Sequence, residues 1–244
     1  MKRLNHTILH LAILTALLQN TTAFAQWQSS FHSDIGIHNA SDGGFVRMGN
    51  VTSFRFNDYI LKAGLQTELI SHKPTFLSGV MVRAGEELQI GEQKVQLTGL
   101  YTVNRFSDLM HELNRGLFAT TSYKNFHFEL GTHFRAYVYN KNAREEYNIQ
   151  GNTRLTESWN LIYKIGYALK PPEHQWNLSL TVTNLDLFLI HQETNPMLQL
   201  SGTYAVSPNI SLHADAFYQQ AGLFNINIHY FGFYFRPGIK WHIQ

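Results

Sequence analysis

The chain of 244 residues contains no cysteine, only six prolines and few charged residues, which make up 15% of its length. Without cysteine, a disulfide framework, a thiolate zinc site and a cysteine nucleophile are all excluded. The formal net charge is +2 and no basic block interrupts the sequence, which disfavours nucleic-acid binding. No stretch after the N-terminal region approaches 18 uninterrupted apolar residues, so the sequence also excludes a transmembrane helix.

Apolar and aromatic residues are abundant instead, at 44% and 14% of the chain. This composition excludes intrinsic disorder, because so much apolar side chain can bury a core or face lipid. No linker rich in Pro, Gly or Ser and no shift in composition divides the chain. We therefore expect a single domain.

The N-terminal 25 residues have the pattern of a secretory signal peptide. Lys2 and Arg3 precede an apolar run over residues 8–18, and Ala23-Phe24-Ala25 forms a small-residue cleavage site. A buried N-terminal helix is the alternative, but the flanks of the run favour cleavage after Ala25. Residues 26–244 then contain as many basic as acidic residues, 17 of each, because the segment removed holds two basic residues and no acidic one.

Alternation of apolar and polar residues with period two recurs along residues 26–244 and predicts strands with two chemically different faces. The clearest example is residues 126–139, where Phe126, Phe128 and Leu130 alternate with His127 and Glu129. Residues 59–69 and 159–170 repeat the pattern. Stretches of more than ten residues are long for soluble strands but suit strands that cross a bilayer at a tilt.

The fold predicted is all-β: a closed antiparallel transmembrane barrel of about 14 strands, with 12 as the alternative. Tight connections at Asn57-Asp58, Lys124-Asn125, Glu157-Ser158 and 207–209 follow even-numbered strands, and longer connections follow odd ones, as in barrels with short periplasmic turns and longer outer loops. The strands expected are 27–38, 44–57, 59–71, 75–84, 93–104, 115–124, 126–140, 146–156, 159–170, 175–183, 185–192, 196–206, 210–219 and 224–243. Strand 185–192 is marginal, and residues 106–113 have helical spacing, which predicts a short loop helix.

The chain resembles single-chain bacterial outer-membrane β-barrels, particularly those of Bacteroidota-type bacteria. The resemblance rests on Ala23-Phe24-Ala25 followed by Gln26, on the alternating strands, and on the aromatic-rich ending over residues 235–244. It implies an outer-membrane location in a Gram-negative bacterium, and a last strand of the kind that the barrel assembly machinery reads. Gln244 stands where an aromatic residue is usual in such proteins, and Pro237 removes a hydrogen-bond donor from the closing strand.

The phase of the alternation places ten of the 17 basic residues on inward positions but only four acids: Asp34, Glu68, Glu129 and Asp215. A basic lumen of this kind favours small anionic solutes. The alternative is an interior filled by hydrogen-bonded charge pairs that only maintain the shape of the barrel. The basic residues expected to line the lumen are Arg47, Arg55, Lys62, Arg83, Lys94, Arg135, Arg154, Lys164, Arg236 and Lys240.

Aromatic residues near the ends of the expected strands predict interfacial girdles in contact with outer-membrane lipid. Packing in the core of a soluble β-sandwich is the alternative for some of them. The aromatic residues expected in the girdles are Trp27, Tyr59, Tyr123, Trp159, Trp176 and Trp241.

Catalytic and metal-binding patterns are weak. His127, Glu129 and His133 share a strand face, but residues i and i+6 of a strand are about 20 Å apart, so one metal ion cannot bind all three. His213 and Asp215 are weak catalytic candidates, because a carboxylate can orient an imidazole general base. We expect no metal and no cofactor. The function expected is a passive pore or structural barrel, and the alternative is an outer-membrane enzyme acting on lipid or peptide.

Overall fold

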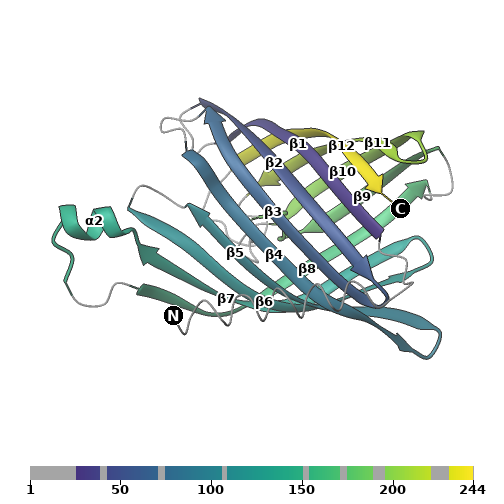
Figure 1. The fold of residues 1–244 in the computed structure, drawn as a ribbon, viewed down its shortest axis with the longest axis horizontal. Coiled ribbons are helices and arrows are strands. Elements are labelled where there is room, and N and C mark those ends of the chain that lie inside the picture. Colours follow the sequence, from purple (N-terminus) through teal and green to yellow (C-terminus); the bar gives the residue numbers. More distant parts are fainter. Residues whose placement is uncertain are drawn as a thin grey trace, which may run out of the picture.

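The computed structural model describes residues 26–38, 43–70, 75–105, 109–150, 154–170, 175–188, 196–220 and 231–243, and residues 1–25, predicted to be a signal peptide, lie outside this part. The described chain forms twelve strands and one short helix (Figure 1). The strands are β1 (Gln26–His38), β2 (Gly43–Phe56), β3 (Tyr59–Ile70), β4 (Thr75–Ile90), β5 (Gln93–Arg105), β6 (Met110–Tyr123), β7 (Phe126–Tyr139), β8 (Arg154–Lys170), β9 (Trp176–Thr183), β10 (Met197–Ser207), β11 (Ile210–Gln220) and β12 (Phe231–Ile243), and the helix is α2 (Lys141–Glu146).

Every strand pairs antiparallel with its sequence neighbours, and β12 pairs with β1 to close the barrel. Closure gives every strand two hydrogen-bonded neighbours, which is what a sheet in hydrocarbon requires. The predicted fold class is confirmed. The predicted count of 14 strands is wrong, and the alternative of 12 is correct.

Two segments account for the difference in strand number. The stretches 146–156 and 159–170 were expected as separate strands, but β8 runs through Glu157-Ser158 as one strand, with a register shift opposite Phe134 and Ala136. A bulge of this kind disturbs the period-two pattern without ending the strand. The second segment is 185–192, whose described residues 185–188 are not in a strand.

The predicted loop helix over residues 106–113 is also wrong where it can be compared, because β6 begins at Met110 and includes Leu113. Met110 and Leu113, which the helical spacing would place on one side of a helix, lie on opposite faces of β6. The one helix of the described ranges, α2, lies in the β7–β8 connection, where Lys141 and Glu145 form an exposed i,i+4 ion pair.

All four two-residue turns lie at one end of the barrel, which we call the turn end, and we call the opposite end the loop end. Two-residue turns join β2 to β3, β4 to β5, β6 to β7 and β10 to β11. Asn57, Lys124 and Gly91 adopt positive φ angles of 52°, 53° and 61° in three of them, as tight hairpins require. Lys170 and Trp176, which flank a connection expected at the loop end, lie at the turn end because β8 is one strand.

The closing strand accommodates Pro237 without losing register. Pairing between β1 and β12 is interrupted between His32–Gly238 and Ile35–Phe235, then resumes in the same register. On its other side Pro237 is opposite Ala214 of β11. One missing donor therefore interrupts one ladder locally but leaves the closure of the barrel intact.

The outward side chains form an apolar belt around the closed sheet. They alternate with buried inward positions along each strand, as the pleat requires. Such a surface is unstable in water and typical of a barrel that spans a lipid bilayer. Exposed members of the belt include Phe31, Leu65, Leu117, Leu130, Ile165, Leu200, Leu212 and Ile239.

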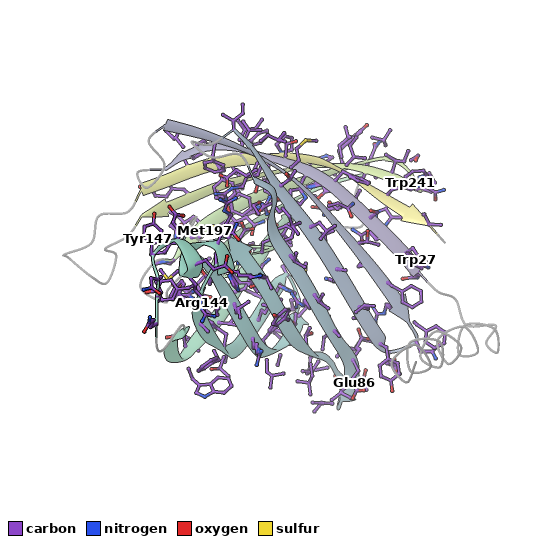
Figure 2. The ribbon with its side chains drawn as sticks, turned by 60° about the vertical axis from the view of Figure 1, so that its left-hand side comes forward. Trp27, Glu86, Arg144, Tyr147, Met197 and Trp241 are labelled. Carbon is purple, nitrogen blue, oxygen red and sulfur yellow. The ribbon has the colours of Figure 1, made fainter. Side chains whose placement is uncertain are left out.

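The six aromatic residues expected in interfacial girdles are all exposed. Trp27, Tyr59, Tyr123, Trp176 and Trp241 lie at the first or last residues of their strands at the turn end. Trp159 lies instead toward the loop end of β8, opposite Phe134 of β7. Figure 2 shows Trp27 and Trp241 at one end of the barrel and Arg144 and Tyr147 at the other.

No helix within the described ranges is both long enough and apolar enough to cross a membrane.

Replacing Leu117, which is 65% exposed on the lipid side, tests the belt. We expect Leu117→Arg to lower the free energy of unfolding from lipid vesicles by about 2–4 kcal/mol, because a guanidinium would be placed deep in hydrocarbon. The measurement is a denaturant titration of the folded protein in vesicles. Leu69→Arg, at the loop end of β3, is the control and should cost about 0–1 kcal/mol. Equal effects of the two substitutions would contradict the depth assigned to the belt.

Candidate pore constriction and lumen

After β9 the chain turns into the barrel, and residues 184–188, which we call the inward segment, cross its interior. The segment starts at Asn184. Its side chain makes hydrogen bonds to the backbone of β8 in place of the next residue pair of the β8–β9 ladder. The backbone N–H of Tyr163 donates to Asn184 Oδ1 at 2.9 Å, and Asn184 Nδ2 donates to the carbonyl of Leu161 at 2.8 Å. The side-chain amide thus satisfies the edge of β8 while the backbone departs from the wall.

A buried ion-pair network holds the middle of the inward segment. Arg236 of β12 donates to both carboxylate oxygens of Asp186, at 2.7 and 3.0 Å, and to both oxygens of Asp34 of β1, at 2.5 and 2.9 Å. Tyr234 Oη also donates to Asp186, at 3.0 Å. Gln66 Nε2 donates to Asp34 at 3.2 Å. One guanidinium therefore binds two carboxylates from two separate parts of the barrel.

Aromatic rings surround this guanidinium and exclude water from it. Phe217 and Tyr234 stack with their ring centroids 4.3 Å apart. The guanidinium carbon of Arg236 lies 4.8 Å from the centroid of Phe217. Cation–π attraction and exclusion of water both strengthen the electrostatic interactions of the network.

Phe188 anchors the far end of the inward segment in an apolar patch on the opposite wall. Its side chain is 2% exposed and packs in a cluster of inward residues from β4, β5, β6 and β8. Asn104 Nδ2 donates to the Phe188 carbonyl at 2.6 Å. The other buried members of the cluster are Met81, Leu100, Phe118 and Ile162.

Two glycines of the wall provide the space that Phe188 occupies. A Cβ added at Gly64 would lie 3.1 Å from ring carbons of Phe188, and one at Gly79 would lie 3.3 Å from the ring. Both distances are tighter than ordinary van der Waals contact. The inward segment therefore fits this barrel at this height because β3 and β4 carry no side chain there.

Between the inward segment and the turn end lies a polar cavity of about 500 Å³. Asp186, Leu187 and Arg236 border it on the loop side, and side chains of the wall surround it. A second cavity of about 570 Å³ opens at the turn end and shares Gln28, Ser53 and Lys62 with the first. The two cavities adjoin at these three residues, and together we call them the vestibule, which extends from the turn end to the inward segment.

Most of the basic residues expected to make the lumen positive lie in ion pairs. Arg83 pairs with Glu129 at 2.9 Å, and Arg236 with Asp34 and Asp186. The remaining pairs are Arg47–Glu68 at 3.6 Å, Arg55–Glu87 at 2.5 Å, Lys94–Glu87 at 2.9 Å and Arg135–Glu112 at 3.5 Å. Arg154 lies in β8, and its side chain is outside the part that the structure describes.

Three lysines differ from the rest. Lys62, Lys164 and Lys240 line the 500 Å³ cavity, and no described carboxylate lies within ion-pair distance of any of them. Each of the three ammonium groups repels the other two. The excess positive charge of the described lumen is therefore concentrated in the vestibule.

Three acids of the interior were missed in the sequence analysis. Glu87 lies in β4, which runs six residues beyond its expected end, and Glu112 lies in the part of β6 that was expected as helix. Asp186 belongs to the inward segment. Extending the alternation through Gly85 would have placed Glu87 on the same face as Arg83, but no pattern in the sequence distinguishes Asp186 from a loop residue.

The weak catalytic candidates do not form a dyad. His213 and Asp215 both line the vestibule from β11. No described group accepts or donates a hydrogen bond at His213 Nδ1, and the ring packs closely against Gly238. Within the described residues, no group of three or more His, Asp or Glu side chains is placed to hold a metal ion.

No family model and no curated protein sequence matches the chain. Among solved structures, it is similar to the NanC porin, with a TM-score of 0.50 at 13% identity over 86% of this chain and 98% of that one. The KdgM porin in complex with disordered oligogalacturonate gives 0.49 at 11% identity, over 88% and 99%. The translocator domain of the autotransporter NalP from Neisseria meningitidis gives 0.48 at 11%, over 98% and 95%. At 13% identity the similarity to the NanC porin shows the fold alone, which is that of an outer-membrane barrel.

Replacing Arg236 tests the network. We expect Arg236→Met to lower the free energy of unfolding by about 3–5 kcal/mol, because Asp34 and Asp186 would remain buried without a counter-charge. Arg47→Met is the matched control: its pair with Glu68 is partly exposed, so the loss should be about 0–1 kcal/mol. Denaturant titration in vesicles measures both. A loss at Arg236 no greater than at Arg47 would show that the network does not hold the barrel together.

Proposed function

We propose that the protein is a passive outer-membrane pore for small anionic solutes. The observation that carries the proposal is the arrangement of the interior, where a polar vestibule ends at the inward segment and contains three lysines with no ion-pair partner among the described residues. A barrel that served only as a scaffold would not need a vestibule open at one end. The apolar belt and the aromatic girdle support a location in the outer membrane.

The inward segment is the constriction of this pore. After leaving β9, the segment contacts β12 through Asp186. It then reaches the wall formed by β3, β4 and β5, which Phe188 contacts. Polar contacts hold one point and apolar packing holds the other, so the segment has a defined position rather than filling the lumen at random. The width left beside it limits the size of a solute that passes.

The unpaired lysines supply the selectivity. An anion in the vestibule meets three positive charges, whereas a cation meets repulsion from all three. The low-dielectric wall of the barrel concentrates this field along the lumen. The barrel fold shared with the NanC porin suits such a role, and the choice of solute is this chain's own.

Planar-bilayer recording tests the pore. We expect the purified protein to conduct, with a reversal potential in a KCl gradient that indicates preference for Cl⁻ over K⁺. The double substitution Asp186→Asn and Phe188→Ala should raise the single-channel conductance, because it removes both anchors of the constriction. Leu130→Ala, on the lipid side of β7 and away from the constriction, is the control and should leave the conductance near that of the parent.

Two outcomes would overturn the proposal. If neither the parent nor the double variant conducts, the barrel is not a pore. If the parent conducts but prefers K⁺, the lysines do not set the selectivity and the solute is not anionic.

A further inference from the structure

Lys62, Lys164 and Lys240 come from three distant strands, β3, β8 and β12, and their side chains meet in one cavity. The register places Lys62 opposite Ser53 and Arg83, and Lys240 opposite Ser30 and Ser211. Lys164 is opposite Glu129. The fold of the barrel thus brings the three lysines together, although they are far apart in the sequence.

The carboxylates that line the same cavity are largely committed elsewhere. Glu129 pairs with Arg83 at 2.9 Å, and Asp186 pairs with Arg236. Asp215 is the one carboxylate of the cavity lining for which the described residues include no ion-pair partner. Three mutually repelling ammonium groups therefore face one uncommitted carboxylate, which leaves excess positive charge in a confined space.

We propose that this cavity is a binding site for a small oxyanion that carries at least two negative charges on carboxylate or phosphate groups. The inference rests on the proposed function, since it names the class of solute that would rest in the pore. A multivalent anion would relieve the repulsion among the three ammonium groups, whereas a monovalent anion would relieve little of it.

The remaining lining of the cavity suits such a ligand. Its neutral polar side chains can hydrogen-bond oxygen atoms at many angles, and lysine provides a point charge with three donors rather than a fixed planar fork. Both features favour recognition by charge over recognition of one shape. A volume of about 500 Å³ is within the range of small-molecule sites. The neutral polar residues are Gln28, Ser30, Ser53, Asn177, Ser179, Gln199, Ser201 and Thr203.

The geometry also gives a direction of entry. Toward the turn end, the cavity adjoins the second cavity of about 570 Å³, which shares Gln28, Ser53 and Lys62 with it. On the loop side it meets Asp186 and Leu187 of the inward segment. A ligand therefore reaches the lysines more readily from the turn end, which is expected to be the periplasmic end because it carries the short turns.

Calorimetric titration of the detergent-solubilised full-length barrel with citrate, pyrophosphate and acetate tests the site. We expect the two multivalent anions to bind much more tightly than acetate, and each Lys→Gln substitution at 62, 164 or 240 to weaken citrate binding about tenfold. Lys141→Gln, which removes an equally charged but fully solvated lysine of α2, is the control and should bind citrate as the parent does. Citrate and pyrophosphate compared with each other show whether carboxylate or phosphate is preferred.

The triple variant with arginine at all three positions keeps the charge and checks that the parent barrel tolerates substitution there. If it folds and binds citrate while the triple glutamine variant folds and does not, the site is supported. Citrate affinity that is equal in the parent and the triple glutamine variant would overturn it, as would equal affinity for citrate and acetate.

Bilayer recording separates this inference from the pore itself. Citrate added at the turn end should block the chloride current at lower concentration than citrate added at the loop end, and the block should disappear in the triple glutamine variant. Conduction without citrate binding or block would overturn the site and leave the pore standing. Citrate binding by a barrel that does not conduct would overturn the pore and leave the site standing.

Discussion

The guanidinium of Arg236 joins two structural tasks that are separate in sequence. Its contacts with Asp34 connect β12 to β1, the two strands that close the barrel, and its contacts with Asp186 hold the inward segment. Asp34 and the guanidinium are buried and the Asp186 side chain is only 12% exposed, so the three charged groups depend largely on one another for their solvation. The closure of the barrel and the position of the inward segment therefore both depend on the positive charge of Arg236.

The sequence predicts the fold well because a lipid-facing barrel imposes period two on nearly every strand. The prediction fails where another requirement overrides that period. A bulge in β8 divides one strand into two apparent ones, and residues 185–188 look like a strand but enter the lumen, where apolar side chains pack without alternation. Helical spacing at 106–113 was misleading because Met110 to Leu113 belong to β6, where Met110 and Glu112 lie on the inward face and Leu113 on the outward face.

The candidate site is less predictable than the fold for a related reason. Inward phase identifies the lysines and arginines of the wall, but it does not identify their partners. Glu87, Glu112 and Asp186 neutralise cations that the sequence alone leaves unpaired, and each lies in a segment whose structure was assigned incorrectly. An error in strand bounds thus becomes an error in the predicted charge of the lumen. The sequence predicts a lumen that is positive throughout, whereas in the described structure the excess positive charge lies in the vestibule.

Gly64 and Gly79 give the constriction a property that its charges do not. The ring of Phe188 packs against the wall because β3 and β4 have glycine at that height. The inner width of the barrel there therefore depends on the absence of two side chains. Volume at these two positions can change by one methyl group without altering any charge in the lumen. The size limit of the barrel and its preference for charge are therefore set by different residues, and a related chain can change one while keeping the other.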